Sequence, residues 1–291
     1  MFFYDDYVIE KHKISINFKF IINLTKIHFY IQERNVILKS IFDQPKKTLM
    51  KYLVFLFSIL LFSCSSADKK LTAQQIIDKT INASGTDKVE NSEITFSFRD
   101  LNYVAIRENG KFELSREIDT IKEVLTNDGF KRFVNGNEAE IDEEMSQRIT
   151  NSINSVHYFS VLPFGLNDKA VRKKLLPSTS IKGKEYYKVE VSFVENGGGE
   201  DFEDIFIYWI GKQDFLIDYL AYSYHTNGGG KRFRVLKEQC NRNGIRFVDY
   251  QNYKPLTKEI KLNNLDEAFE KNQLKIISEI VLEDIKVEFL N

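Results

Sequence analysis

The chain has 291 residues and a formal net charge of −1, and 43% of its residues are hydrophobic, which is typical of a globular protein with one domain or two small ones. Two cysteines and four prolines are too few for a disulfide framework or a proline-rich linker protein. Because the charge is near neutral and no basic cluster could neutralise a phosphate backbone, we expect no nucleic-acid partner.

Residues 1–49 differ in composition from the rest of the chain. They contain neither Ala nor Gly and are dominated by Ile, Phe, Lys, Asn and Tyr, whose codons are rich in A and U. We interpret this segment as upstream sequence that was included by assigning the start too early, with Met50 as the true initiator. The alternative is a genuine arm that is disordered or forms a strand.

Residues 50–63 have the pattern of a short bacterial lipoprotein signal peptide. Lys51 supplies positive charge, residues 52–62 form an apolar core, and Ser63 is the small residue before Cys64. The apolar core is too short for a helix that crosses about 30 Å of hydrocarbon. We therefore predict an export signal that is removed. The alternative is a core helix or strand that packs these Phe and Leu side chains into the domain.

Cleavage before Cys64 would make this cysteine the first mature residue, carrying thioether-linked diacylglycerol and usually a third, amide-linked acyl chain. Because each buried methylene contributes about 0.8 kcal/mol, two or more chains anchor a protein stably in a membrane. Residues 64–70 would be a polar tether, and Cys240 an unpaired and buried thiol. Lipidation forbids the alternative, a Cys64–Cys240 disulfide. We expect an outer-membrane lipoprotein of the cell envelope and slightly prefer its periplasmic face to the cell surface, because residues 65–70 contain a single acid.

Residues 71–291 are predicted to form a single domain that begins with a helix. Thr72 and Gln75 have the spacing of a capping box, and Gly85 is placed to end the helix in a left-handed conformation. A second helix is predicted to begin at Asp142 and to leave the helical path at Pro163. Its apolar face would consist of Met145, Ile149, Ile153 and Val156.

Apolar and polar residues alternate from residue 92 onward, and Asn-Gly turns at residues 109–110, 135–136 and 243–244 separate the predicted strands. A short helix is expected over residues 265–274, followed by closing strands to residue 289. Roughly nine to eleven strands and two or three helices give an α+β fold. We predict a strongly curved antiparallel sheet, an open and incomplete β-barrel, with helices packed on its concave side. The absence of a βαβ alternation disfavours a Rossmann-like enzyme.

Four stretches of this sequence resemble an uncharacterised lipoprotein family of Bacteroidota over about residues 71–288. They are "NSVHYFSVLPFGLND" (154–168), "KGKEYYKVEVSF" (182–193), "YLAYSYHTNGGGKRFR" (219–234) and "NGIRFVDYQNYKP" (243–255). More distantly, the order of the strands "EYYKVEV", "IFIYWIGKQDFLIDYLAYS" and "NGIRF" is similar to that of the Lol-type lipoprotein carriers. This second resemblance implies an open, incomplete β-barrel with helices plugging its concave side. Neither resemblance implies a catalytic residue.

Two glycine runs, residues 196–199 and 227–230, have the composition of phosphate-binding loops, but predicted strands flank them and no helix follows. We therefore predict hairpin turns, which could shape one rim of a pocket. The acidic cluster at residues 200–204 lacks the Asp-x-Asp-x-Asp-Gly order of a calcium loop and is predicted to be a solvated turn.

His157 and His225 are the two histidines after Cys64, and two imidazoles without cysteine partners do not predict a zinc site. No Gly-x-Ser-x-Gly motif singles out a nucleophilic serine. We therefore predict no catalytic residue, no metal and no cofactor. His157, at the end of an apolar helix face, is expected to be a core histidine with satisfied hydrogen bonds, and catalysis by either histidine is the alternative.

The concentration of aromatic residues, with 24 Phe and 14 Tyr, is the feature from which we predict a binding site. The predicted ligand-binding residues are Phe159, Phe164, Trp209, Tyr219, Tyr222, Tyr224 and His225. An open sheet lined with aromatic rings would offer an apolar surface to acyl chains, while tyrosine hydroxyls orient a polar head. Core packing accounts for the same residues without a ligand.

From these features we predict a membrane-anchored lipoprotein without enzymatic activity. It would be attached to the membrane through Cys64 and would bind a hydrophobic small molecule or lipid in the half-barrel. One alternative is an envelope scaffold that binds proteins or glycans through sheet edges or aromatic surface. The other is an envelope hydrolase whose turnover depends on His157 or His225. No oligomeric state is predicted.

Overall fold

The computed structural model describes residues 70–194, 203–225 and 228–290. The predictions for residues 1–69, including lipidation of Cys64, lie outside the described residues. The helices are α3 (Ala73–Ser84), α4 (Glu143–Ser160) and α5 (Leu265–Glu270), with the short 3-10 helices η1 (Thr86–Asn91) and η3 (Leu262–Asn264). Within the described part of the chain, none of the helices combines the length and the apolar character that crossing a membrane requires.

Fourteen strands of the described residues form two antiparallel sheets of seven strands each. Sheet A has the order β14-β1-β2-β3-β4-β5-β6 and sheet B the order β13-β12-β11-β10-β9-β8-β7. The strands of sheet A are β1 (Ser92–Phe98), β2 (Leu101–Glu108), β3 (Lys111–Ile118), β4 (Ile121–Thr126), β5 (Gly129–Val134), β6 (Asn137–Glu138) and β14 (Glu283–Phe289). Those of sheet B are β7 (Val171–Ile181), β8 (Lys184–Phe193), β9 (Ile205–Gly211), β10 (Ile217–Tyr224), β11 (Gly230–Arg242), β12 (Ile245–Pro255) and β13 (Leu274–Ile280).

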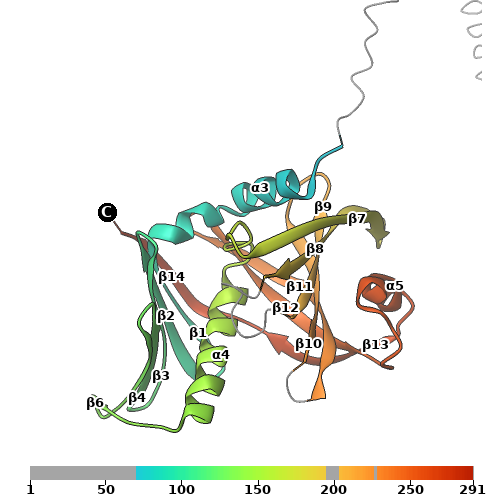
Figure 1. The fold of residues 1–291 in the computed structure, drawn as a ribbon. Coiled ribbons are helices and arrows are strands. Elements are labelled where there is room, and N and C mark those ends of the chain that lie inside the picture. Colours follow the sequence, from blue (N-terminus) through green and yellow to red (C-terminus); the bar gives the residue numbers. More distant parts are fainter. Residues whose placement is uncertain (1–69, 195–202, 226–227, 291) are drawn as a thin grey trace, which may run out of the picture. The chain divides into compact units, whose positions relative to one another are not determined.

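The two sheets are meanders in which hydrogen-bonded neighbours follow one another along the chain, except where β14 pairs with β1. The chain passes from β13 of sheet B through residues 281–282 into β14 of sheet A, so these two strands link the sheets (Figure 1). Strands β6 and β7 form the far edges of the series and do not pair with each other in the described structure. The prediction of an open, curved antiparallel sheet is confirmed.

Several predicted helix ends and turns are confirmed, because each depends on a few neighbouring residues, whereas the helix expected over residues 265–274 ends at Glu270. Thr72 and Gln75 form the capping box of α3, and Gly85 ends the helix with a φ of 65°. Asp142 caps α4 by accepting a hydrogen bond from a backbone N–H. In the β2–β3 turn, Asn109 and Gly110 have φ values of 52° and 77°, as a type I′ hairpin turn requires.

The structure has more strands than the predicted nine to eleven, and β7 is the longest of those missed. Its sequence contains Pro177 and several charged residues, which read as a loop. Strand β7 lies at the edge of sheet B, where a proline removes no ladder hydrogen bond that another strand needs. The register with β8 shifts between Leu176 and Thr179, so Pro177 lies in an irregular part of the pairing.

Helix α4 lies between the two sheets, and α3 runs across one end of sheet B (Figure 1). Ile149 and Ile153 of α4 pack against Ala105 and Leu114 of sheet A. Fully burying one such isoleucine contributes about 1.5–3 kcal/mol. On the side of sheet B, α3 and the segment after α4 cover a second cluster that contains Tyr208. These two helices occupy the predicted position on the concave side.

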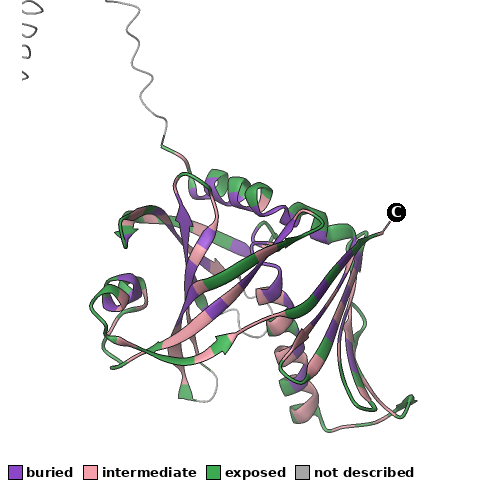
Figure 2. Ribbon diagram, turned by 180° about the vertical axis from the view of Figure 1, so that it is seen from behind, coloured by how far each residue is buried: buried purple, intermediate pink, exposed green. Residues whose placement is uncertain are grey.

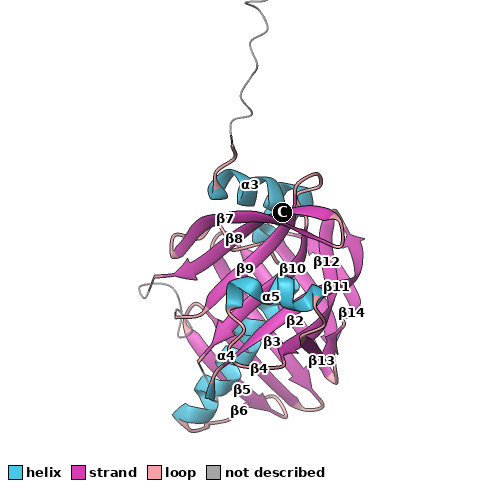
Figure 3. Ribbon diagram, turned by 90° about the vertical axis from the view of Figure 1, so that its right-hand side faces the viewer, coloured by secondary structure: helices cyan, strands magenta, loops and turns pink. Residues whose placement is uncertain are grey.

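Helix α5 differs from the prediction because it packs on the other face of sheet B (Figure 3). Its Leu265 joins a cluster with Trp209 and Phe233, and much of the helix is buried (Figure 2). Sheet B is therefore covered on both faces. For this reason, polar residues on either face of sheet B can be buried.

Candidate functional site

A cavity of about 250 Å³ lies where α4 passes between sheet A and sheet B. Sheet B contributes residues from β11, β12 and β13, and sheet A contributes the end of β1 and the turn after it. The lining residues are Phe98, Arg99, Ser152, Ser155, Val156, Phe159, Ser160, Arg234, Val248, Tyr250, Asn252, Ser278, Ile280 and Leu282.

The cavity exists because α4 presents two different faces to the two sheets. Ile149 and Ile153 are four residues apart and fill the space toward sheet A. Ser152, Ser155 and Phe159, spaced by three and four residues, form a second face that lines the cavity. Because two of these three side chains are small, the helix leaves space that larger apolar residues would fill.

Arg234 of β11 is the charged residue that is buried in the cavity wall, with 8% of its surface exposed. Its guanidinium carbon lies 3.7 Å from the ring centroid of Phe159 and 5.3 Å from that of Tyr222. Nη2 donates a hydrogen bond to the Tyr222 hydroxyl at 3.2 Å, whereas the buried Nε has no partner. Among the described residues, no carboxylate forms an ion pair with this guanidinium. A cation buried in this way is costly without a counter-charge.

Asn252 of β12 lies directly opposite Arg234 in the register of the two strands. Its Nδ2 donates to Ser278 Oγ at 3.1 Å, and its Oδ1 is buried without a hydrogen-bond partner. Tyr250, two residues earlier on the same face of β12, is 4% exposed. Burial raises the pKa of Tyr250 to about 12, although Arg246 and Arg234 oppose this, so its hydroxyl keeps its proton near neutral pH.

The remaining lining makes the cavity apolar with a positive charge. Two arginines and no acidic residue occur among the described residues that line it. The second arginine, Arg99, is exposed in the β1–β2 turn and lies over the ring of Phe98, 5.0 Å from the centroid. Val156, Ile280 and Leu282 belong to the apolar part. Such a lining suits a molecule with an apolar portion and a hydrogen-bonding or anionic group.

The structure brings only part of the predicted ligand-binding set to this cavity. Phe159 lines it, and Tyr222 holds Arg234 and lies 5.4 Å from Phe159 between ring centroids. Tyr224 and His225 instead line a surface hollow of about 670 Å³, together with Gly228, Gly229 and Gly230 of the second glycine run. That run lies in the β10–β11 hairpin, as predicted, for the part of it that is described.

Phe164 lies in a cluster with sheet A, where the guanidinium of Arg107 is 5.4 Å from its ring centroid. Trp209 and Tyr219 are on the face of sheet B that α5 covers. Trp209 Nε1 donates to Asp266 of α5 at 3.0 Å. Of these, Phe164, Trp209 and Tyr219 are core residues away from the cavity.

A buried ion pair fixes α5 on this second face. Lys188 Nζ lies 3.0 Å from Asp266 Oδ2, and the two side chains are 9% and 3% exposed. The same lysine lies over the ring of Trp209, 5.0 Å from the centroid. The ammonium group, the carboxylate and the indole N–H all have partners within this cluster. The cluster therefore has a structural role and offers no unpaired polar group to a ligand.

Sequence reasoning missed Arg234 and Asn252. Phe233 and Val235 alternate with Arg234 along β11, which reads as a strand with one apolar and one solvent-facing side. Because sheet B is covered on both faces at this point, β11 is buried around Arg234 on its polar side as well. The Asn243–Gly244 turn was the signal that could have found them. A hairpin at this turn pairs segments 230–242 and 245–255 and places Arg234 opposite Asn252.

The two histidines predicted as alternatives for catalysis lie apart. His157 of α4 is fully buried, and its Nε2 donates to the carbonyl oxygen of Ser115 at 3.0 Å. Its Nδ1 has no partner, so the expected full satisfaction of its hydrogen bonds is wrong. His225 has a side chain 66% exposed and lies 3.5 Å from Asp204. In the described part of the chain, no group of three or more His, Cys, Asp or Glu could hold a metal ion.

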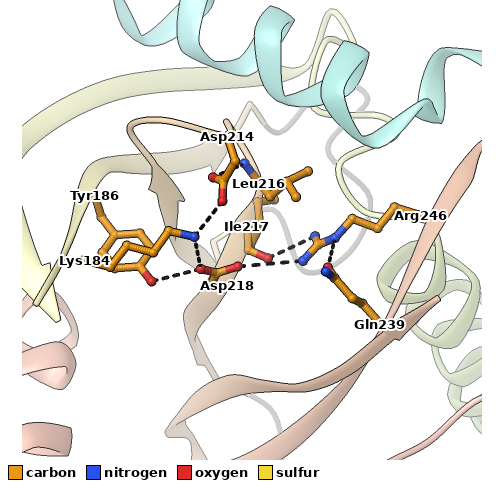
Figure 4. Close-up of polar contacts among 8 residues, drawn as sticks. All are labelled: Lys184, Tyr186, Asp214, Leu216, Ile217, Asp218, Gln239 and Arg246. Carbon is orange, nitrogen blue, oxygen red and sulfur yellow. Dashed lines mark hydrogen bonds and ion pairs between the residues drawn. The ribbon is translucent and has the colours of Figure 1, made fainter. Parts of the chain in front are cut away.

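A network of charged side chains holds the β9–β10 turn to β8 and β12 (Figure 4). Lys184 Nζ donates to Asp214 and Asp218 at 2.7 Å each, and the Tyr186 hydroxyl donates to Asp218 at 2.9 Å. Arg246 Nη2 lies 3.8 Å from Asp218 Oδ1. Burial and the charge of Asp218 raise the pKa of Tyr186, which keeps its hydroxyl protonated. The arrangement therefore suits a structural clamp rather than a site of proton transfer.

The structure describes Cys240 and part of the acidic cluster. Cys240 is free and half-buried, not buried as expected. Of the acidic cluster, residues 200–202 and the first glycine run at 196–199 lie outside the described residues, while Asp204 is buried.

The fold and the cavity define a protein of two open antiparallel sheets that enclose an apolar, positively charged space beside a central helix. The family of unknown function DUF6503 matches residues 50–284, and the chain belongs to this family. None of the curated proteins with which the sequence was compared matches it.

Three solved structures that match the chain have low sequence identity to it. A LolA superfamily protein from Nitrosomonas europaea is 13% identical over 76% of this chain and 96% of its own, with a TM-score of 0.44. A DUF1329 family protein from Desulfovibrio piger is 10% identical over 75% and 93%, with a TM-score of 0.43. The lipoprotein LppX from Mycobacterium tuberculosis is 8% identical over 54% and 90%, with a TM-score of 0.25.

Proposed function

We propose that this protein is a membrane-anchored bacterial lipoprotein that binds a hydrophobic or amphiphilic ligand, such as a lipid or an acyl chain, in the cavity between its sheets. The observation that carries the proposal is the second face of α4. The small side chains of half-buried Ser152 and exposed Ser155 leave open space beside this face, between the helix and sheet B.

The size and lining of the cavity support a bound ligand. About 250 Å³ of space lies between a buried wall that includes Tyr250 and an exposed edge at Ser155, so a ligand would displace water from apolar surface there. Replacing Ser155 by a larger residue would fill part of this space without disturbing a buried side chain, because Ser155 is exposed at the edge of the cavity. The volume lies just below the usual range of roughly 300–1,000 Å³ for ligand pockets, so we expect a compact ligand or one end of a longer chain.

The membrane anchor in this proposal is diacylglycerol on Cys64, after removal of residues 50–63. The match of the family model from residue 50 onward supports Met50 as the initiator and residues 1–49 as upstream sequence. We also propose that the protein is attached on the periplasmic side of the outer membrane and is related to lipoproteins of Bacteroidota.

We propose a binding role without catalysis. His157 is buried inside the structure, and burial lowers its pKa to about 4, which leaves it a weak base with its one donor held by Ser115. His225 lies in the separate surface hollow. The cavity itself offers an arginine, an amide and hydroxyl groups, which can bind a molecule but do not form a nucleophile and base pair.

The test is analysis of the lipids that co-purify with the full-length protein, extracted with organic solvent and identified by mass spectrometry. Ser155→Phe should reduce the co-purifying apolar species at least about tenfold, because the new ring occupies the cavity. Asn154→Phe is the matched control, since Asn154 is the exposed neighbour on α4 that does not line the cavity. If no apolar species accompanies the wild type, or if both variants retain it equally, the proposed function is wrong.

A further inference from the structure

A purely apolar ligand would leave the strongest polar feature of the cavity unused. Arg234 is 8% exposed, its Nε has no hydrogen-bond partner, and no carboxylate of the described residues is paired with it. Phe159 and Tyr222 lie against the guanidinium and fix its plane. The side chain is thus held in place before any ligand arrives, which lowers the entropy that binding must overcome.

Asn252 provides an independent polar group at the same place. It is the cross-strand neighbour of Arg234, and side chains in such pairs have Cβ atoms about 4.5–5.5 Å apart. Its Oδ1 is a buried acceptor without a donor, while Nδ2 is engaged by Ser278. A cation and an unpaired acceptor therefore lie side by side in one cavity wall.

We propose that the ligand is an anionic amphiphile whose carboxylate or phosphate oxygens bind Arg234 and whose neighbouring hydroxyl or amide N–H donates to Asn252 Oδ1. This inference rests on the proposed function and specifies the chemistry of its ligand. The Tyr222 hydroxyl accepts a hydrogen bond from Arg234, so its own O–H is available to the same oxyanion. The apolar chain would lie along Val156, Phe159 and Ile280.

Charge selects this class over a neutral lipid. Binding an oxyanion replaces an uncompensated buried cation by a charge-assisted pair, whereas a neutral head leaves the cation uncompensated. A hydrogen bond to a charged group corresponds to roughly tenfold or more in affinity. Arg99 also carries positive charge, but it is exposed at the cavity edge and solvated, so it contributes less to the selection.

The test uses membranes that contain the full-length protein and two photoreactive probes. One is a medium-chain fatty acid with a diazirine in its chain, and the other is the primary alcohol of the same chain. After irradiation, cross-links to α4 and β12 are quantified by peptide mass spectrometry. The wild type should label with the acid at least about tenfold more strongly than with the alcohol.

Substitutions of the two arginines assign that preference to one residue. Arg234→Gln should remove the preference for the acid and leave labelling by the alcohol, while Arg234→Lys should retain part of it. Arg99→Gln should reduce the preference far less than Arg234→Gln does, because Arg99 is exposed. Resistance of the domain to limited proteolysis in the same membranes shows whether each variant is folded, and Arg234→Lys decides the matter if Arg234→Gln does not fold.

A second pair of variants tests whether a carboxylate of the protein can replace that of the ligand. Asn252→Asp places a carboxylate opposite Arg234, where it should pair with the guanidinium and abolish the preference for the acid. Gln251→Glu is the matched control, because successive residues of β12 point to opposite faces of sheet B. It adds the same charge away from the cavity and should change nothing.

The outcomes separate this inference from the proposed function. Equal labelling of the wild type by acid and alcohol would refute the anionic head but leave a ligand-binding cavity. A loss of the preference in Arg99→Gln as large as that in Arg234→Gln, or persistence of the preference in Arg234→Gln or Asn252→Asp, would also refute the role of Arg234. If neither probe labels the cavity, the proposed function itself fails.

Discussion

His157 is predicted to make the folded protein sensitive to mild acid. Its imidazole is fully buried, with Phe96 and Tyr103 packed edge-on at 5.7 and 5.5 Å between ring centroids. Nε2 donates to the Ser115 carbonyl, so the proton of an imidazolium would have to be added at Nδ1, which has no partner. Burial, together with the smaller effect of the charge of Arg107, lowers the pKa of His157 to about 4, although the Ser115 hydrogen bond opposes this.

The magnitude follows from the difference between the folded and unfolded states. An ordinary pKa of 6.5 in the unfolded chain and about 4 in the folded protein correspond to about 3 kcal/mol. Between these values the unfolded chain binds the proton and the folded protein does not. The stabilising contribution is therefore complete above the unfolded pKa and is lost as the pH falls through this window toward about 4.

The assay is denaturant unfolding of the full-length protein across this pH range, for the wild type and for His157→Gln. Glutamine retains an N–H donor for the Ser115 carbonyl but does not titrate. Between about pH 7 and about pH 4, the wild type should lose about 3 kcal/mol of unfolding free energy relative to the variant. His225→Gln, which removes an exposed imidazole, is the control. A difference between wild type and His157→Gln that stays constant within about 0.5 kcal/mol would refute this reasoning.

Three further predictions concern stability and anchoring. Asp266→Ala should lower the free energy of unfolding by about 3–5 kcal/mol in denaturant titrations, because it leaves Lys188 buried and unpaired beside Trp209. Gly85→Ala should cost at least about 2 kcal/mol in the same assay, since its φ is 65° and a Cβ would collide with the backbone of the β11–β12 turn. Cys64→Ala should abolish incorporation of a clickable fatty acid and release the protein from the membrane fraction.

Each of these has a matched control. Glu185→Ala breaks the exposed ion pair between Glu185 and Lys212 and should lower the free energy of unfolding by less than about 1 kcal/mol. Gly110→Ala meets no neighbouring atom, so only the positive φ is strained and the cost should be about 1–2 kcal/mol. Cys240→Ala should leave fatty-acid labelling unchanged. Equal effects of a variant and its control would contradict the mechanism assigned to it.

The elements that could be predicted are those encoded by a few adjacent residues. The capping box at Thr72, the helix stop at Gly85 and the Asn-Gly hairpin turns each depend on local conformational preferences. The open antiparallel meander followed from their succession. Edge strand β7 was missed because it contains a proline. An edge strand tolerates proline, but the edge position depends on the whole sheet and not on the neighbouring residues.

The candidate site could be predicted less well because it depends on which face of a strand a residue occupies. Tyr219 and Tyr222 are three residues apart on β10 and therefore point to opposite faces of sheet B. Aromatic composition placed them together, whereas the structure puts Tyr219 under α5 and Tyr222 beside the cavity. Arg234 escaped notice because burial of both faces of the sheet depends on helices distant in the sequence.

The pairing of β1 with β14 has a consequence for the biogenesis of the protein. Ser92 lies beside Phe289, so β1, the first strand of the described residues, acquires this neighbour only after β14 has been made. Until then one margin of β1 is an open template for pairing with foreign strands. Sheet A is therefore completed only after the strands of sheet B have been synthesised, and a variant that lacks β14 should leave this margin of β1 open.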